Sequence, residues 1–133
     1  MKEKILLGNS WPMTLIRRPV QIEPLPIERL RSYLKEADGK FYSFWGHTNT
    51  IAAANKLLGV DVTPKTERPA VELTYEGLPT FEGEVFWRVY ILNPDYRPGF
   101  RPQIGQEVGE EDITGWTCLR VTYPLRLVGG RLV

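Results

Sequence analysis

A short apolar run near the start of the chain, Ile5-Leu6-Leu7, constrains the fold more than any other feature. Apolar residues there do not alternate with polar ones, and such a run predicts a strand over Lys4–Gly8 that is buried on both faces. The residues that follow, Asn9 to Pro12, favour a turn that ends this strand. The rest of the chain is therefore expected to cover both faces of the sheet that contains it.

Two later segments show helical spacing. Pro26 suits the first turn of a helix, and Asp38-Gly39 predicts where that helix ends. The apolar residues between them recur at the required intervals, at Ile27, Leu30, Tyr33, Leu34 and Ala37.

The second helix is expected to have Thr48 or Asn49 as its N-cap and Gly59 as its C-terminal stop. Its apolar face would consist of Ile51, Ala54, Leu57 and Leu58.

The remaining segments read as strands and one long connection. Extended structure is predicted over Val20–Pro26, Phe41–Trp45, Val71–Tyr75, Val85–Leu92 and Thr117–Tyr123. Between the last two lies Asn93–Gly115, which is rich in Pro and Gly and carries three acids in a row. It is longer than a passive connection usually is, so we predict a long loop over about 93–115 with a binding or lid role. The fold class expected for residues 1–133 is α+β, a single domain with a mixed sheet flanked by helices.

Composition excludes several classes of function. The 133 residues suit one soluble domain, and no run reaches the roughly 18 apolar residues that a membrane span requires. No signal peptide is recognisable, so a cytoplasmic location is expected. Cys118 and His47 are each the only residue of their type, which excludes a zinc site built from such residues within one chain, and we expect neither a metal nor a cofactor. The net charge of +1 argues against a grip on long nucleic acid.

His47 lies where the second helix is about to start. The first turn of a helix has backbone N–H groups without an internal partner and carries partial positive charge, so phosphate groups bind there. A histidine beside a phosphate becomes a suitable general acid, because the anion favours the imidazolium form. The residues expected to donate to such a group are Gly46, Thr48, Asn49 and Thr50. The alternative is that His47 is a turn residue whose ring bonds a backbone carbonyl.

The order of several motifs resembles a known family, the ring nucleases of viruses and bacteria that act as type III anti-CRISPR proteins. Asn9-Ser10 follows the first strand, and Gly46-His47-x-x-Thr50 is followed at the family's spacing by Leu57-Leu58-Gly59. Pro64 and Arg68 come next in a loop. The resemblance covers about Lys4 to Arg68 and is weak beyond that point.

The resemblance implies a symmetric homodimer that encloses cyclic tetra-adenylate and degrades it, which shuts off type III CRISPR signalling in the host cytoplasm. No metal would take part. A ribose 2′-hydroxyl would attack the neighbouring phosphate and leave a 2′,3′-cyclic end, while His47 protonates the departing 5′-oxygen. Such an intramolecular attack needs positioning, charge neutralisation and one acid rather than a metal cluster.

The resemblance also assigns roles to other residues of this chain, each of which has an alternative interpretation. Asn9 and Ser10 match a family turn that touches ribose or phosphate, although a simple strand-ending turn has the same sequence. Arg68 matches the family's loop arginine only if one inserted residue is allowed, and it would otherwise be a solvated charge. The later family arginine, which stabilises the phosphate, corresponds to Arg97 or Arg101.

The chain departs from the family after these arginines. No glutamate occupies the expected place, and Glu107 is the nearest acid downstream. The ligand is therefore either cyclic tetra-adenylate, cyclic hexa-adenylate or another cyclic nucleotide. A protein that binds such a ligand without turnover, or one that binds a protein partner, is the second interpretation. A structural viral protein that shares only the fold is the third.

The aromatic residues divide into two groups. Phe44 and Trp45 are expected to pack in the core. Tyr96 and Phe100, in the Pro/Gly-rich segment, are better placed to stack on a base. Trp11 remains open between these two roles.

Overall fold

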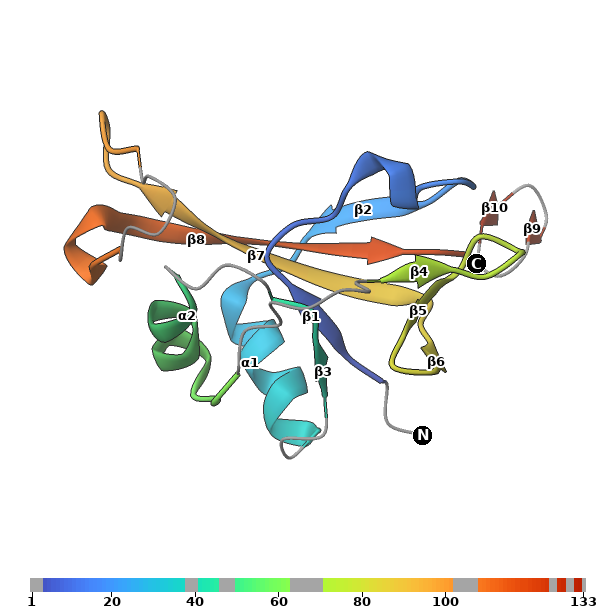
Figure 1. Cartoon of the computed structure of the whole chain (residues 1–133), viewed down its shortest axis with the longest axis horizontal. Helices are drawn as coiled ribbons and strands as arrows, with labels where there is room; N and C mark the ends of the chain where they lie inside the picture. The colour runs from blue at the N-terminus through green and yellow to red at the C-terminus, as the bar shows by residue number, and fades with distance from the viewer. Residues whose placement is uncertain are drawn as a thin grey trace.

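A five-stranded mixed sheet forms the centre of the computed structural model (Figure 1). The model describes residues 4–37, 41–45, 50–62, 71–101, 108–124, 127–128 and 131–132. The sheet has the order β2-β8-β7-β1-β3, and its strands are β1 (Leu6–Gly8), β2 (Gln21–Pro24), β3 (Tyr42–Ser43), β7 (Arg88–Tyr96) and β8 (Ile113–Thr122). β1 runs parallel to both β3 and β7, whereas β8 is antiparallel to β7 and β2. The predicted single-domain α+β class with a mixed sheet is confirmed.

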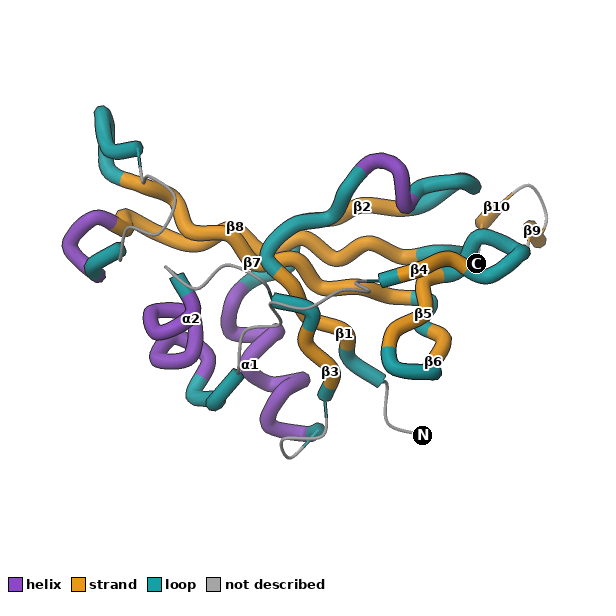
Figure 2. Tube along the Cα trace, viewed as in Figure 1, coloured by secondary structure: helices purple, strands orange, loops and turns teal. Residues whose placement is uncertain are grey.

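Both described helices cover the same face of this sheet (Figure 2). They are α1 (Ile27–Glu36) and α2 (Ile51–Leu58), and each buries its predicted apolar stripe. Ile5 and Leu7 point into the core beneath the helices, which also contains Tyr90, Leu92 and Cys118. Neither helix is long and apolar enough to cross a bilayer.

The opposite face of the sheet has its own core. Leu6 lies there with Val89, Ile91 and Val121, and aromatic side chains cover them. Leu6 and Leu7 are both fully buried, on opposite faces of β1. The two-sided burial predicted from the apolar run is therefore confirmed.

Short elements complete the described chain. A meander of three strands packs beside the second core, and its order is β4-β5-β6. Its strands are β4 (Glu72–Leu73), β5 (Pro79–Phe81) and β6 (Glu84–Val85), and the other short elements are β9 (Leu127–Val128), β10 (Arg131–Leu132), η1 (Met13–Leu15) and η2 (Glu110–Asp112).

The long loop predicted over 93–115 is strand at both of its ends, where β7 and β8 pair as a hairpin. β7 continues to Tyr96, and β8 begins at Ile113, so that Asn93 pairs with Thr117 and Asp95 with Gly115. Past Ile91 the described part of β7 has a strand only on its β8 side, and proline is tolerated at such an edge. Pro94 therefore does not end the strand. This extension of β7 and β8, with the described residues of its tip, is the arm on the left of Figure 1.

The predicted strand Val85–Leu92 is also divided. Phe86 donates its N–H to Pro79 in the meander, whereas Trp87 accepts from Tyr123 at the end of the main sheet. The chain changes sheets at these two residues, so β6 ends at Val85 and β7 starts at Arg88.

Candidate functional site

The carboxyl ends of β1 and β3 lie at the same edge of the sheet, because the two strands are parallel neighbours. Asn9 follows β1 directly and is 8% exposed, while Ser10 is exposed. In open sheets with parallel strands, ligands bind beside such carboxyl ends. Asn9 lies at this edge, and its contact with a ligand stays a prediction.

Gly8 is required at the end of β1. The backbone of Phe44 bonds to Leu7, and its ring lies directly over Gly8. A Cβ at Gly8 would overlap that ring, so the packing of the Phe44 ring on the end of β1 depends on glycine here.

α2 starts at the same edge (Figure 1). Its N-cap is Thr50, which is 3% exposed and does not cap the helix with its side chain. The N-cap was predicted at Thr48 or Asn49, so the helix begins later than expected. The described residues on either side of the connection from β3 to α2, Trp45 and Thr50, are both buried.

Five of the predicted site residues lie outside the described residues: Gly46, His47, Thr48, Asn49 and Arg68. The structure places the other five. Asn9, Ser10 and Thr50 lie near the carboxyl edge, and Arg97 and Arg101 lie on the arm.

Arg97 is held within the arm by an acid from the turn η2, which directly precedes β8. Its backbone N–H donates to the carbonyl of Asp112, and its Nε lies 2.8 Å from Asp112 Oδ1. The guanidinium also lies 4.9 Å from the centre of the Phe100 ring. Asp112 is thus the acid beside the candidate arginine, and sequence reasoning did not assign it, since only the hairpin register brings the two together.

Arg97 and Asn9 of the same protomer lie far apart. Gly8 pairs with Ile91, and Arg97 follows Ile91 by six residues along an extended chain. At about 3.3 Å per residue, the two candidate residues are separated by roughly 15–20 Å. Arg101 is exposed and follows the turn that the Phe100 N–H closes by donating to the carbonyl of Arg97.

Most of the aromatic residues have packing roles, as expected. Trp45 is 1% exposed, and Phe44 contacts the rings of Trp11 and Phe81. Trp11 donates its indole N–H to the hydroxyl of Tyr123, which settles its role as structural.

Tyr96 and Phe100 pair with each other on the arm, with ring centres 5.4 Å apart. Burial raises the pKa of Tyr96 above its ordinary value, so its hydroxyl stays protonated at neutral pH. Stacking of either ring on a base stays a prediction.

Comparison with known proteins bears on the fold. The chain shares its fold with a viral protein. B116 of Sulfolobus turreted icosahedral virus superposes with a TM-score of 0.58 at 19% sequence identity, over 90% of this chain and 98% of B116. No family model matches the sequence, and no curated protein does. The structural neighbour is thus a small archaeal-virus protein.

Among the described residues, no group of three metal-binding side chains comes together. The described residues near the carboxyl edge offer the side-chain amide of Asn9 and the hydroxyls of Ser10 and Thr50. Such groups orient and neutralise a phosphodiester.

Proposed function

We propose that this protein is a metal-independent ring nuclease, a phosphodiesterase that opens a cyclic oligoadenylate and thereby shuts off type III CRISPR signalling. Cyclic tetra-adenylate is the first candidate substrate. The observation that carries the proposal is the motif Gly46-His47-x-x-Thr50 with Leu57-Leu58-Gly59 at the family's spacing. Two described features support it: α2 begins directly after Thr50, and Asn9 directly follows β1 at the same edge.

The chemistry assigned to these residues is a transesterification. The ribose 2′-oxygen attacks the adjacent phosphorus, the bond from phosphorus to the 5′-oxygen breaks, and the product is a 2′,3′-cyclic phosphate. His47 supplies the proton that the departing 5′-oxygen takes up. Backbone donors at the start of α2, with Asn9 and the hydroxyl of Thr50, would orient the phosphate and neutralise its charge.

The arginines of the arm could contact the ligand only in a dimer. Arg97 lies too far along the arm to reach a phosphate beside Asn9 of its own protomer. In a symmetric dimer the arm of one protomer would instead supply Arg97 or Arg101 to a ligand shared by both. Two-fold symmetry suits a cyclic ligand with an even number of identical nucleotides.

A second candidate function is binding without turnover. It is favoured by the pairing of Arg97 with Asp112, which already neutralises one of the two guanidinium groups that could contact the phosphate. The protein would then sequester the cyclic nucleotide rather than destroy it.

The decisive assay incubates the protein in EDTA with cyclic tetra-adenylate, cyclic hexa-adenylate and the all-2′-deoxy analogue of the tetramer, and analyses products by mass spectrometry. The proposal predicts linear products with 2′,3′-cyclic phosphate ends from a ribose ring and an intact deoxy analogue, which lacks the attacking hydroxyl. Recovery of intact ribose ligand from a stable complex would support the sequestering protein. If neither ring is cleaved or bound, both candidates are wrong.

A further inference from the structure

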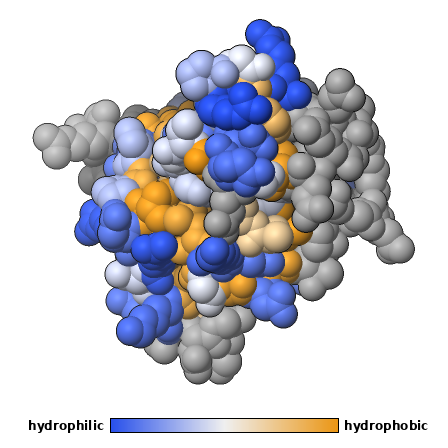
Figure 3. Space-filling model, turned by 90° about the vertical axis from the view of Figure 1, so that its left-hand side faces the viewer, coloured by the Kyte–Doolittle hydropathy of each residue, from blue (hydrophilic) through white to orange (hydrophobic). Residues whose placement is uncertain are grey.

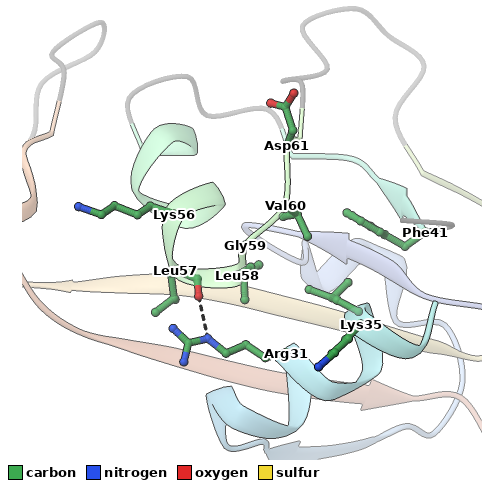
Figure 4. Close-up of a pocket in the computed structure, with 10 residues that line it drawn as sticks. Arg31, Lys35, Phe41, Lys56, Leu57, Leu58, Gly59, Val60 and Asp61 are labelled. Carbon is green, nitrogen blue, oxygen red and sulfur yellow. Dashed lines mark hydrogen bonds between the residues drawn. The ribbon is translucent and has the colours of Figure 1, made fainter. Parts of the chain in front are cut away.

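A second concave surface lies at the other end of α2, away from the candidate site (Figure 4). It is a cavity of about 730 Å³ between the carboxyl-terminal halves of α1 and α2. Aliphatic side chains form much of its lining, and Phe41 lies at one end. The aliphatic residues are Leu34, Leu57, Leu58 and Val60.

Cationic side chains border this cavity. Arg31 and Lys35 extend from α1 one helical turn apart, and Lys56 extends from α2, against a single carboxylate at Asp61 (Figure 4). Arg31 donates from Nε to the carbonyl of Leu57 over 2.7 Å. This bond links the two helices and fixes a guanidinium at the edge of the apolar floor.

A smaller cavity of about 330 Å³ continues the first one towards the arm. The two share Arg31, Lys56 and Leu57, and the smaller one ends against Ile113 and Trp116 of β8. We term the surface formed by these two adjoining cavities the α2 groove. The view from the side of α2 and the arm shows apolar surface bordered by hydrophilic residues (Figure 3).

We propose that the α2 groove binds an acidic amphipathic helix of another protein. Such helices insert apolar side chains, spaced at three and four residues, into grooves with apolar floors. Acidic residues flanking the inserted stripe would pair with Arg31 and Lys35, and Lys56 adds to the positive charge on the α2 side. Charge complementarity of this kind selects the partner and orients it.

The same charges argue against self-association through this surface. A two-fold contact places the same patch of both protomers face to face. Arg31, Lys35 and Lys56 would then approach their own copies, and among the described residues that line the two cavities Asp61 is the one carboxylate that would oppose them. The occupant is therefore expected to be a different, acidic chain. The proposal is independent of the nuclease proposal, which uses the opposite end of α2.

The test uses a fluorescein-labelled helical peptide of about 15 residues, with leucines at helical spacing on one face and glutamates beside them, followed by fluorescence anisotropy. The control peptide has the same leucines and lysines in place of glutamates. We expect the wild-type protein to bind the acidic peptide about tenfold or more tightly than the basic one, and binding to weaken with salt.

The protein variants locate the site. Lys35→Glu, and independently Lys56→Glu, should weaken binding of the acidic peptide about tenfold, whereas Arg29→Glu should leave it within about twofold. Arg29 lies on the same helix, is exposed and does not line the groove. Thermal melts of all three variants identify any that fails to fold, and the conclusion is drawn from those that melt like wild type.

Three results overturn the proposal: no binding of the acidic peptide, equal binding of both peptides, or equal effects of folded Lys35→Glu and Arg29→Glu. A fourth comes from sedimentation velocity. If a wild-type dimer dissociates in Lys35→Glu but not in Arg29→Glu, the groove is covered by a second copy of the chain.

Discussion

Gly8 ends β1 next to the candidate site, and the ring of Phe44 occupies the space that a side chain at residue 8 would need. Gly8→Ala should lower the free energy of unfolding by about 1–3 kcal/mol, the usual cost of overpacking. Urea denaturation followed by circular dichroism measures this change.

A double-mutant cycle identifies the cause. In a Phe44→Ala background the ring is absent, so Gly8→Ala should cost much less than in wild type. Equal costs in both backgrounds would show that the contact with Phe44 is not the reason glycine is needed.

Cys118 carries a pH-dependent contribution to stability. Burial raises the pKa of its thiol from 9.0 to about 11, although the charge of Arg120 opposes the shift. Above pH 9 the unfolded chain loses this proton while the native protein keeps it, so the native state binds more protons and stability falls as pH rises. The stabilisation that the protonated thiol gives the native state is fully present below pH 9 and is lost as the pH rises to about 11.

The measurement compares wild type with Cys118→Ala in urea denaturation across this pH range. The free energy of unfolding of wild type should fall by roughly 2–3 kcal/mol more than that of the variant, because tyrosine ionisation is common to both. Parallel pH profiles would contradict the buried thiol as the source.

At the scale of the element, Arg97 on the arm formed by β7 and β8 has either a structural or a functional role, and the variant Arg97→Ala distinguishes the two. Its side chain is 52% exposed, and exposed ion pairs contribute little. Arg97→Ala should therefore change the free energy of unfolding by less than about 1 kcal/mol, while the proposed contact with phosphate predicts a loss of cleavage of about tenfold or more.

Asp112→Ala is the matched variant, since it breaks the same ion pair but keeps the guanidinium. Cleavage by this variant should stay near the wild-type rate. If both variants lose activity equally, the ion pair positions the arm and Arg97 does not act on the ligand.

The elements that the sequence predicted correctly have their signals within a few neighbouring residues. The apolar run at Leu6 and Leu7 indicated burial on both faces, and Gly59 ends α2 with a left-handed conformation, φ 69°. Glycine adopts that conformation without strain, which is why it marks helix ends.

The arm was missed because its strands depend on pairing with each other rather than on local pattern. Pro94 and Gly115 are poor strand formers alone, yet they lie in register with Trp116 and Asp95. An irregularity after Asp95 then sets which residues face one another at the tip. The contact between Arg97 and Asp112 depends on that register, so no local motif indicated it.

At the scale of the molecule, α2 connects two separate surfaces. Its start lies at the carboxyl edge of the sheet with Asn9, where the nuclease proposal places the ligand. Its end forms part of the α2 groove together with α1. Variants at the start of α2 are therefore expected to lose cleavage of the cyclic nucleotide but keep binding of the acidic peptide, and variants at its end are expected to do the reverse.

The central claim is that one imidazole protonates the departing 5′-oxygen. The most direct measurement compares wild type with His47→Ala under single-turnover conditions in EDTA, with binding of cyclic tetra-adenylate measured for both. The account predicts that the variant binds nearly as tightly but cleaves about 10²–10⁴-fold more slowly, the range expected for a lost general acid. Cleavage at the wild-type rate by His47→Ala would contradict it.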